Sequence, residues 1–257
     1  MGGLGMPVLA GLVLFGLVAG VGITAVGPGG VLVTVGLFAL TGMSPAQVAG
    51  TAIVTHVATG ALATAAYTRS GQLRERGTRR IAGALAAAAV AGTPLGVLVN
   101  SVVSGRVFGI LLGVFVALVG ALVWRRAARP AAAEPGGGRL PGTPVVAAVG
   151  FAVAVASGVF GIGGPMLSVP LLVVLGVPVL SALAAAQAQS VVIATVGTLG
   201  YVAAGAVDWP LAALTGVPEL AGVLLGWVIA RAVPAGALTG SLVVSLFALA
   251  PYLALHG

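Results

Sequence analysis

Two long stretches of this chain contain no formally charged residue. Residues 1–68 and residues 140–207 lack Asp, Glu, Lys and Arg altogether. A transmembrane α-helix needs about 20 consecutive apolar residues, so each stretch is long enough for about three membrane crossings. The sequence therefore predicts an all-α polytopic membrane protein whose main surroundings are the lipid bilayer.

The composition excludes several other classes of protein. Only 6% of the 257 residues are charged, whereas an ordinary soluble domain carries roughly 25%. All eleven basic residues are arginines, and most of them fall in two short runs that match no nucleic-acid-binding motif. Cysteine is absent, which excludes disulfides and thiol catalysis.

Hydropathy predicts ten apolar elements, two of which are short. At 1.5 Å per residue the short elements, 30–42 and 164–176, cover about 20 Å of a core that is roughly 30 Å thick. We expect them to be half-helices that follow glycine-rich breaks, or re-entrant segments. The ten elements lie near 7–26, 30–42, 46–68, 80–100, 107–124, 143–160, 164–176, 180–204, 210–230 and 236–255.

The chain repeats itself at a fixed offset of 134 residues. Gly27-Pro-Gly-Gly30 aligns with Gly161-Ile-Gly-Gly164, and Tyr67 aligns with Tyr201. The sequence thus predicts two transmembrane repeats of about five elements each, residues 1–124 and 143–257. Residues 125–142, rich in Pro, Gly and Ala, read as the linker between them.

The arginines predict the orientation in the membrane. Five lie within 69–80 and four within 125–139, and counting every element as a crossing places these loops and Arg231 on one side. The positive-inside rule makes that side cytoplasmic, with both termini outside. The second repeat is then inverted relative to the first, as in many secondary transporters. If the short elements re-enter instead, the termini and Arg231 change sides.

The paired glycine motifs are the first candidates for a binding site. Such breaks leave the N-terminus of the following helix, with its partial positive charge, free to face an anion. Two breaks in register can converge near the membrane midplane. Tight helix packing through glycine is the alternative interpretation. The candidate residues are Gly27, Gly29, Gly30, Gly161, Gly163 and Gly164.

Polar faces on two longer elements are the second candidates. Thr51, Thr55 and Thr59 recur at a spacing of four, which puts them on one helix face. Gln187, Gln189 and Ser190 occupy the aligned region of the second repeat. Hydroxyls and amides at these positions can donate to an oxyanion, or can form interhelical hydrogen bonds.

Two ionisable residues are candidates for proton coupling. His56 is the only histidine within the predicted membrane segments, and it serves either proton transfer or packing. Glu219 lies inside the element 210–230, opposite Ala89 in the repeat alignment. A carboxylate at that depth is costly and marks a functional site by default. Alternatively, Pro218-Glu219 opens a short helix near the surface.

No sequence motif of an enzyme is present. With two histidines, four acidic residues and no cysteine, no metal-ligand cluster is visible. His-Glu-x-x-His and Gly-x-Ser-x-Gly do not occur. We therefore expect neither an enzyme nor a cofactor or metal site.

The glycine motifs and their surroundings resemble the TauE/SafE sulfite-exporter family. The resemblance rests on Gly27–Gly30, on Phe160–Pro170 and on the stretch from Tyr201 to Trp209, and it covers nearly the whole chain. It implies a secondary transporter of a small anion, such as sulfite or an organosulfonate, in the bacterial plasma membrane, with roles for the six glycines and Thr51. A membrane subunit or receptor-like assembly protein without transport is the alternative. The oligomeric state, coupling ion and direction of transport stay open.

Overall fold

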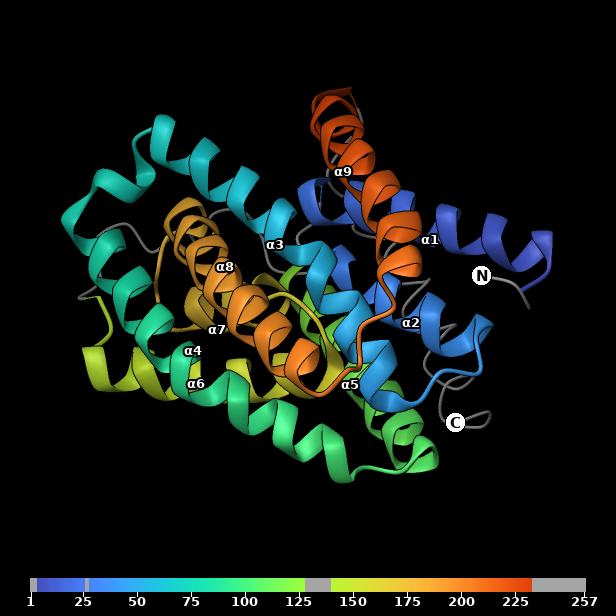
Figure 1. Ribbon diagram of the computed structural model, residues 1–257. Helices are drawn as coiled ribbons and strands as arrows, with labels where there is room; N and C mark the ends of the chain where they lie inside the picture. Colours follow the sequence, from blue (N-terminus) through green and yellow to red (C-terminus); the bar gives the residue numbers. More distant parts are fainter. Residues whose placement is uncertain (1–3, 26–27, 128–139, 233–257) are drawn as a thin grey trace.

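The computed structural model describes residues 4–25, 28–127 and 140–232, and the regular secondary structure of this part of the chain is all helical (Figure 1). Seven of its helices are long and apolar enough to cross a membrane. The prediction of an all-α polytopic membrane protein is therefore confirmed. The helices are α1 (Met6–Ala25), α2 (Val31–Leu40), α3 (Pro45–Arg69), α4 (Arg76–Val102), α5 (Gly105–Ala127), α6 (Thr143–Phe160), α7 (Pro165–Val174), α8 (Val179–Ala203) and α9 (Trp209–Ala232).

Local sequence signals set the helix boundaries. Ser44 caps α3: its hydroxyl accepts from the Gln47 backbone N–H, while the Gln47 side chain accepts from the Ser44 backbone N–H. Pro45 fills the first position of the same helix, where no backbone donor is needed. Helix α6 ends at Gly161, whose φ of 70° is in the left-handed region that favours glycine.

The two short helices follow the glycine breaks. A 3₁₀ turn, η1 (Pro28–Gly30), leads into α2, and the turn after Gly161 leads into α7. Each short helix has ten residues, or about 15 Å of length, half of a bilayer core. Each begins at the glycine break, so its N-terminus lies inside the molecule rather than at a membrane surface.

The long helices pack in a reciprocal pattern between the two halves. Helix α1 of the first half lies along α9 of the second, and α4 of the first half lies along α6 of the second. Glycines permit the close approach: a Cβ on Gly96 of α4 would lie 2.8 Å from the Cα of Gly158 in α6. Each half therefore uses its first and fourth helices to hold the other half.

Helices α3 and α8 pair at the centre and run in opposite directions. Gly50 of α3 packs on Tyr201 near the end of α8, whereas Gly60 packs on Ser190, earlier in α8. The two helices correspond in the sequence repeat, and a parallel repeat would point them the same way. Their antiparallel pairing supports an inverted repeat.

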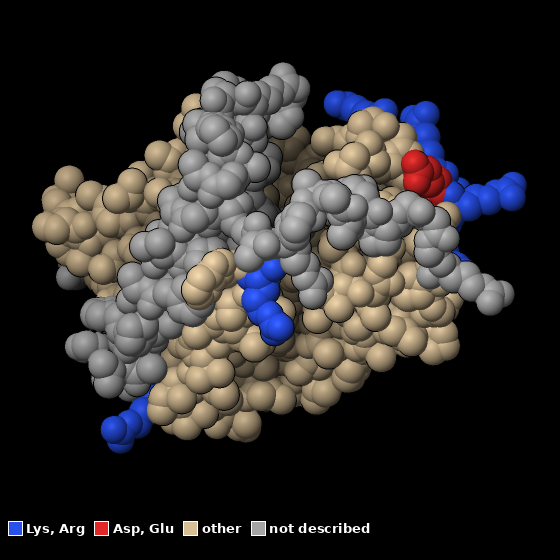
Figure 2. All heavy atoms as spheres, turned by 180° about the vertical axis from the view of Figure 1, so that it is seen from behind, with Lys and Arg blue, Asp and Glu red and all other residues tan. Residues whose placement is uncertain are grey.

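The arginine-rich turn between α3 and α4 marks one end of the molecule. Figure 2 shows most of the visible arginine atoms gathered there. Arg80 donates to the Pro141 carbonyl at 3.0 Å, which brings the start of α6 to this end. Val177, just after α7, packs with Ile81 in the same apolar cluster. Helices α6 and α7 together thus leave this end and return to it, which supports counting the short helices as crossings rather than as re-entrant segments.

Two predictions concern the end of the second half: the position of Glu219 in its helix, and the tenth apolar element. Helix α9 begins at Trp209 and continues through Pro218, so Glu219 lies near its middle. The alternative that Pro218-Glu219 opens a helix near the surface is therefore wrong, since a proline in a membrane helix need not end it. The tenth predicted element, 236–255, lies outside the described residues.

Candidate functional site

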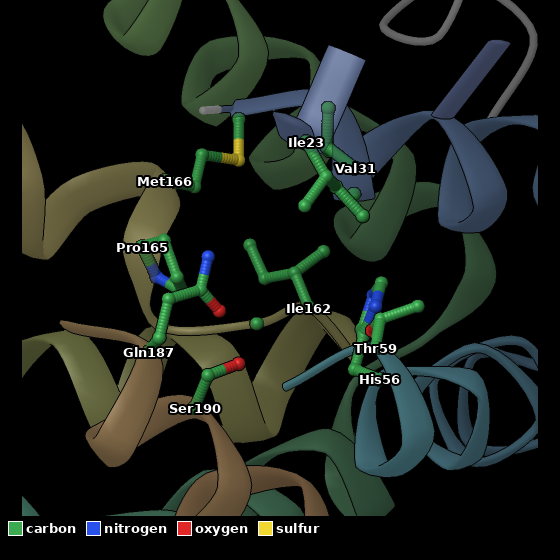
Figure 3. Close-up of a pocket in the computed structure, with 11 residues that line it drawn as sticks. Ile23, Val31, His56, Thr59, Ile162, Pro165, Met166, Gln187 and Ser190 are labelled. Carbon is green, nitrogen blue, oxygen red and sulfur yellow. The ribbon is translucent and has the colours of Figure 1, made fainter. Parts of the chain in front are cut away.

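A cavity lies between the two halves, where the glycine breaks meet the central helices. The space between protein atoms there, counted together with the part that is open to the surroundings, is about 320 Å³. Figure 3 shows His56 and Thr59 on one side and Gln187 and Ser190 on the other, with Ile162 between them in this view. Its lining comprises Ile23, Gly30, Val31, His56, Thr59, Ile162, Gly163, Pro165, Met166, Gln187 and Ser190.

The cavity lies near the middle of the helices that carry its polar side chains. His56 is close to the centre of α3 (Pro45–Arg69), and Ser190 is close to the centre of α8 (Val179–Ala203). The two residues are separated by the 134-residue offset of the repeat. Equivalent positions of the two halves therefore face one cavity. The site is chemically asymmetric, with an imidazole on one side and a hydroxyl on the other.

Both short helices present their N-termini to the cavity. Gly30 and Val31 bring the start of α2 to its wall, and Gly163, Pro165 and Met166 bring the start of α7. Neither helix has a side-chain cap on its first turn. The partial positive charge of a helix N-terminus is therefore available from both halves.

Five residues expected at the site line the cavity: Gly30, His56, Gly163, Gln187 and Ser190. Gly27 lies outside the described residues. Three more of the glycines pack against other parts of the fold. Gly29 abuts Ile23 and Ala19 of α1, Gly161 abuts Ala49 of α3, and Gly164 faces Ile193 and Gln189.

The remaining polar candidates make contacts between and within helices. Thr51 accepts a hydrogen bond from the Asp208 backbone N–H at 3.0 Å. The hydroxyl of Thr55 donates to the Ala52 carbonyl of its own helix at 2.9 Å. Gln189 donates to the Gly150 carbonyl at 3.0 Å and accepts from Ser168. The alternative interpretation, interhelical hydrogen bonding, thus describes Thr51 and Gln189.

The two ring nitrogens of His56 have different surroundings: Nδ1 faces Glu219, and Nε2 lies beside the cavity. Its Nδ1 lies 3.1 Å from Oε1 of Glu219, and both side chains are buried. Its Nε2 is buried and has no hydrogen-bond partner among the residues that the structure describes. A Cβ added at Gly30 would lie 2.9 Å from Cε1 and 3.4 Å from Nε2 of the ring. The Cε1–Nε2 edge therefore faces the start of α2.

Glu219 stands behind His56 rather than in the cavity wall. It is fully buried near the middle of α9, and within the described part of the chain neither carboxylate oxygen has hydrogen-bond geometry to any group. The contact with His56 is thus an ion-pair distance without an aligned hydrogen bond. Sequence reasoning selected both residues but did not pair them, because 163 positions separate them in the chain.

The sequence did not indicate the apolar part of the lining. Ile23, Val31, Ile162 and Met166 line the cavity, but nothing distinguishes them from the many other apolar residues of this chain. Their nearness to the glycine motifs is the one signal that would have found them. The polar Thr59 was part of the threonine face of α3.

The helical architecture and the central site define a multi-pass membrane protein with a small cavity between two halves, lined by apolar residues and a few polar ones. The family model for the sulfite exporter TauE/SafE matches residues 12–253. The chain therefore belongs to the TauE/SafE family, and membership implies an anion-exporting transporter. No curated protein and no solved structure matches the chain.

Proposed function

We propose that this protein is a secondary transporter that carries sulfite or an organosulfonate across the bacterial plasma membrane. The observation that carries the proposal is the cavity at which both glycine breaks meet His56, Gln187 and Ser190. Transporters with inverted repeats bind their substrates near the bilayer midplane, where broken helices point their N-termini at anionic groups. In our proposal the two halves are inverted repeats, and the arginine-rich end faces the cytoplasm.

The electrostatics of the cavity favour a small anion. Among the residues that line it, none is Asp, Glu, Lys or Arg. Apart from His56, the attraction thus comes from two helix N-termini and from neutral donors, the amide of Gln187 and the hydroxyl of Ser190. A helix end contributes about 0.3–1 kcal/mol when exposed and up to about 2 kcal/mol when partly buried. Affinity from these groups is therefore modest, which lets a carrier release its substrate.

Flux through reconstituted protein tests the proposal. Proteoliposomes containing the full chain would be loaded in turn with sulfite, sulfate, sulfoacetate and taurine, and the efflux of each would be measured. We expect saturable flux of sulfite or of an organosulfonate, well above that of empty liposomes. Absence of saturable flux for every compound would overturn the proposal and favour the non-transporting membrane subunit.

Alanine substitutions at the glycine breaks would test whether that flux depends on the cavity. A Cβ at Gly30 would lie 2.9 Å from His56, and one at Gly163 would lie 2.8 Å from the Ser190 hydroxyl. Gly30→Ala and Gly163→Ala should each lower flux about tenfold or more, because the added methyl group fills the space beside these side chains. Gly42→Ala is the matched control, since a Cβ there meets nothing within 4 Å. Equal flux in all three variants would place the site elsewhere.

A further inference from the structure

We infer that His56 binds the anion in its protonated form, through Nε2–H, and that Glu219 is the positioning residue that keeps the imidazole charged and oriented. The inference rests on the proposed function and adds a pH dependence to the same site. It is carried by three features of the structure: the short His56–Glu219 distance, the Nε2 atom without a partner, and the asymmetry between the two halves.

The first step concerns the two nitrogens of the ring. Nδ1 lies 3.1 Å from the Glu219 carboxylate, so a neutral imidazole keeps its single proton on Nδ1. Nε2 is then a bare acceptor, and it repels the oxygens of an anion. A second proton turns Nε2 into a charged donor beside the cavity. Since Nε2 is buried without a hydrogen-bond partner, an anion in the cavity would supply the missing one.

The second step concerns the charge behind the ring. A buried carboxylate without a partner is strongly unfavourable, and an adjacent imidazolium compensates it. The pair is neutral overall when the imidazole carries two protons. The Glu219 carboxylate thus favours the form of His56 that an anion requires, without touching the anion itself.

The third step is that packing does not require this pair. In the repeat alignment the counterparts of His56 and Glu219 are Ser190 and Ala89. Ala89 is fully buried in an apolar cluster with Ile193 of α8. The same place in the other half is thus filled without ionisable groups. A buried histidine and carboxylate in one half alone point to a role in binding rather than in holding the helices together.

No other ionisable group competes for His56 on the elements packed around it. Helices α1, α2, α6 and α7 contain no Asp, Glu, Lys, Arg or His. On α8 the one ionisable residue is Tyr201, whose hydroxyl donates to the Gly158 carbonyl. Asp208 precedes α9; its backbone N–H donates to Thr51, and its carboxylate accepts from the Leu211 N–H. Thr51 lies five residues, about one and a half turns of α3, before His56. The remaining groups on α3 and α4, Tyr67 and the arginines, lie toward the arginine-rich end. On α9 itself, Arg231 is twelve residues, more than three helical turns, beyond Glu219.

The test is the pH profile of anion binding to the purified protein. Calorimetry would use sulfate, methanesulfonate and sulfoacetate, whose charges stay constant between about pH 6 and pH 9 because their acidic groups are ionised throughout. For the wild type we expect a dissociation constant that is flat at low pH. Above a midpoint it should rise about tenfold per pH unit, as one linked proton requires.

The variants separate the charge from the shape of the site. His56→Gln should weaken binding at low pH at least about tenfold and remove the pH dependence. Glu219→Gln should move the midpoint of the binding profile to lower pH, since the neutral amide no longer favours the imidazolium. Glu219→Asp, which keeps the charge, should restore part of the shift. Glu75→Gln, at an exposed carboxylate in the arginine-rich turn, should match the wild type.

Each outcome decides the inference. A flat wild-type profile, or a Glu219→Gln midpoint equal to that of the wild type, would overturn it. A purely structural role for Glu219 would lower affinity equally at every pH, and that result too would overturn it. If Glu219→Gln does not fold, as judged by helix content, the Glu219→Asp and His56→Gln profiles decide. Failure of the wild type to bind or transport any anion would instead overturn the proposed function.

Discussion

Single polar residues divide into those that hold helices together and those that face the cavity. Gln187 and Gln189 are two positions apart on α8, and the sequence marks both as candidates for the site. Two residues along a helix turn by about 200°, so the two amides point to different neighbours. Gln187 lines the cavity, whereas Gln189 is fully buried and joins Ser168 of α7 to Gly150 of α6.

This division predicts opposite effects for the same substitution at the two glutamines. Gln189→Leu removes two interhelical hydrogen bonds and takes the acceptor from the buried Ser168 hydroxyl, so we expect the unfolding free energy to fall by about 1–3 kcal/mol. Gln187→Leu should leave stability within about 0.5 kcal/mol and lower anion flux. Thermal unfolding midpoints and flux, measured on both variants, check the prediction. The reverse pattern would show that the two roles are exchanged.

Residue spacing could predict which residues share a helix face but not where that face points. Thr51, Thr55 and Thr59 do share one face of α3, as their spacing predicts. Yet of these three only Thr59 reaches the cavity, while Thr51 contacts the segment before α9. In a soluble helix, the contrast between apolar and polar faces fixes the rotation. Here 60% of the chain is hydrophobic, and both lipid and protein neighbours are apolar, so rotation depends on tertiary packing.

At the scale of elements, glycine sets how closely the helices of the two halves approach. Gly92 and Gly96 of α4 face α6, where Phe151, Val155 and Gly158 lie against them. Contacts of this kind let backbones meet directly, which is the main source of helix association in a membrane, where lipid is as apolar as the side chains. Gly92 and Gly96 match Gly222 and Gly226 of the second half at an offset of 130 residues, but the sequence alone could not show which helix each one faces.

A pair of glycines on α4 tests the role of close approach. A Cβ at Gly96 would lie 2.8 Å from the Gly158 Cα and 2.9 Å from the Val159 N, whereas a Cβ at Gly83 meets nothing within 4 Å. Gly96→Ala should therefore destabilise the protein by about 1–3 kcal/mol through overpacking. Gly83→Ala should be neutral, or stabilising by up to about 1 kcal/mol. Thermal unfolding of both variants decides, and equal midpoints would contradict the packing argument.

The glycine breaks themselves could be predicted because their cause is local. Pro28 and the neighbouring glycines interrupt the apolar run, and the short helix α2 follows, as expected; the same holds for Gly161 and α7. The continuity of α9 through Pro218 could not be predicted in this way. Neighbouring helices satisfy the backbone groups that a proline frees, and that compensation is a tertiary effect.

At the scale of the whole molecule, the length of α4 indicates that this helix crosses the whole membrane. Its 27 residues extend about 40 Å, more than the roughly 30 Å hydrocarbon core. The arginine-rich turn before α4 and the turn at Ser104 after it must then lie on opposite sides. Five arginines lie in or beside the first turn, whereas Arg106 alone lies beside the second. The positive-inside rule therefore predicts that the first turn is cytoplasmic and the second is outside.

Labelling of single cysteines tests this orientation in intact cells. The natural chain has no cysteine, so Ser70→Cys and Ser104→Cys each introduce the only thiol, and both serines are exposed. The positive-inside rule puts position 70 in the cytoplasm. A membrane-impermeant maleimide should therefore label the Ser104→Cys protein and leave the Ser70→Cys protein unlabelled until the cells are opened. The opposite pattern would invert the orientation while leaving the helix packing intact. Labelling of both positions from outside would contradict the assignment of α4 as a membrane-spanning helix, and with it the placement of the cavity near the midplane.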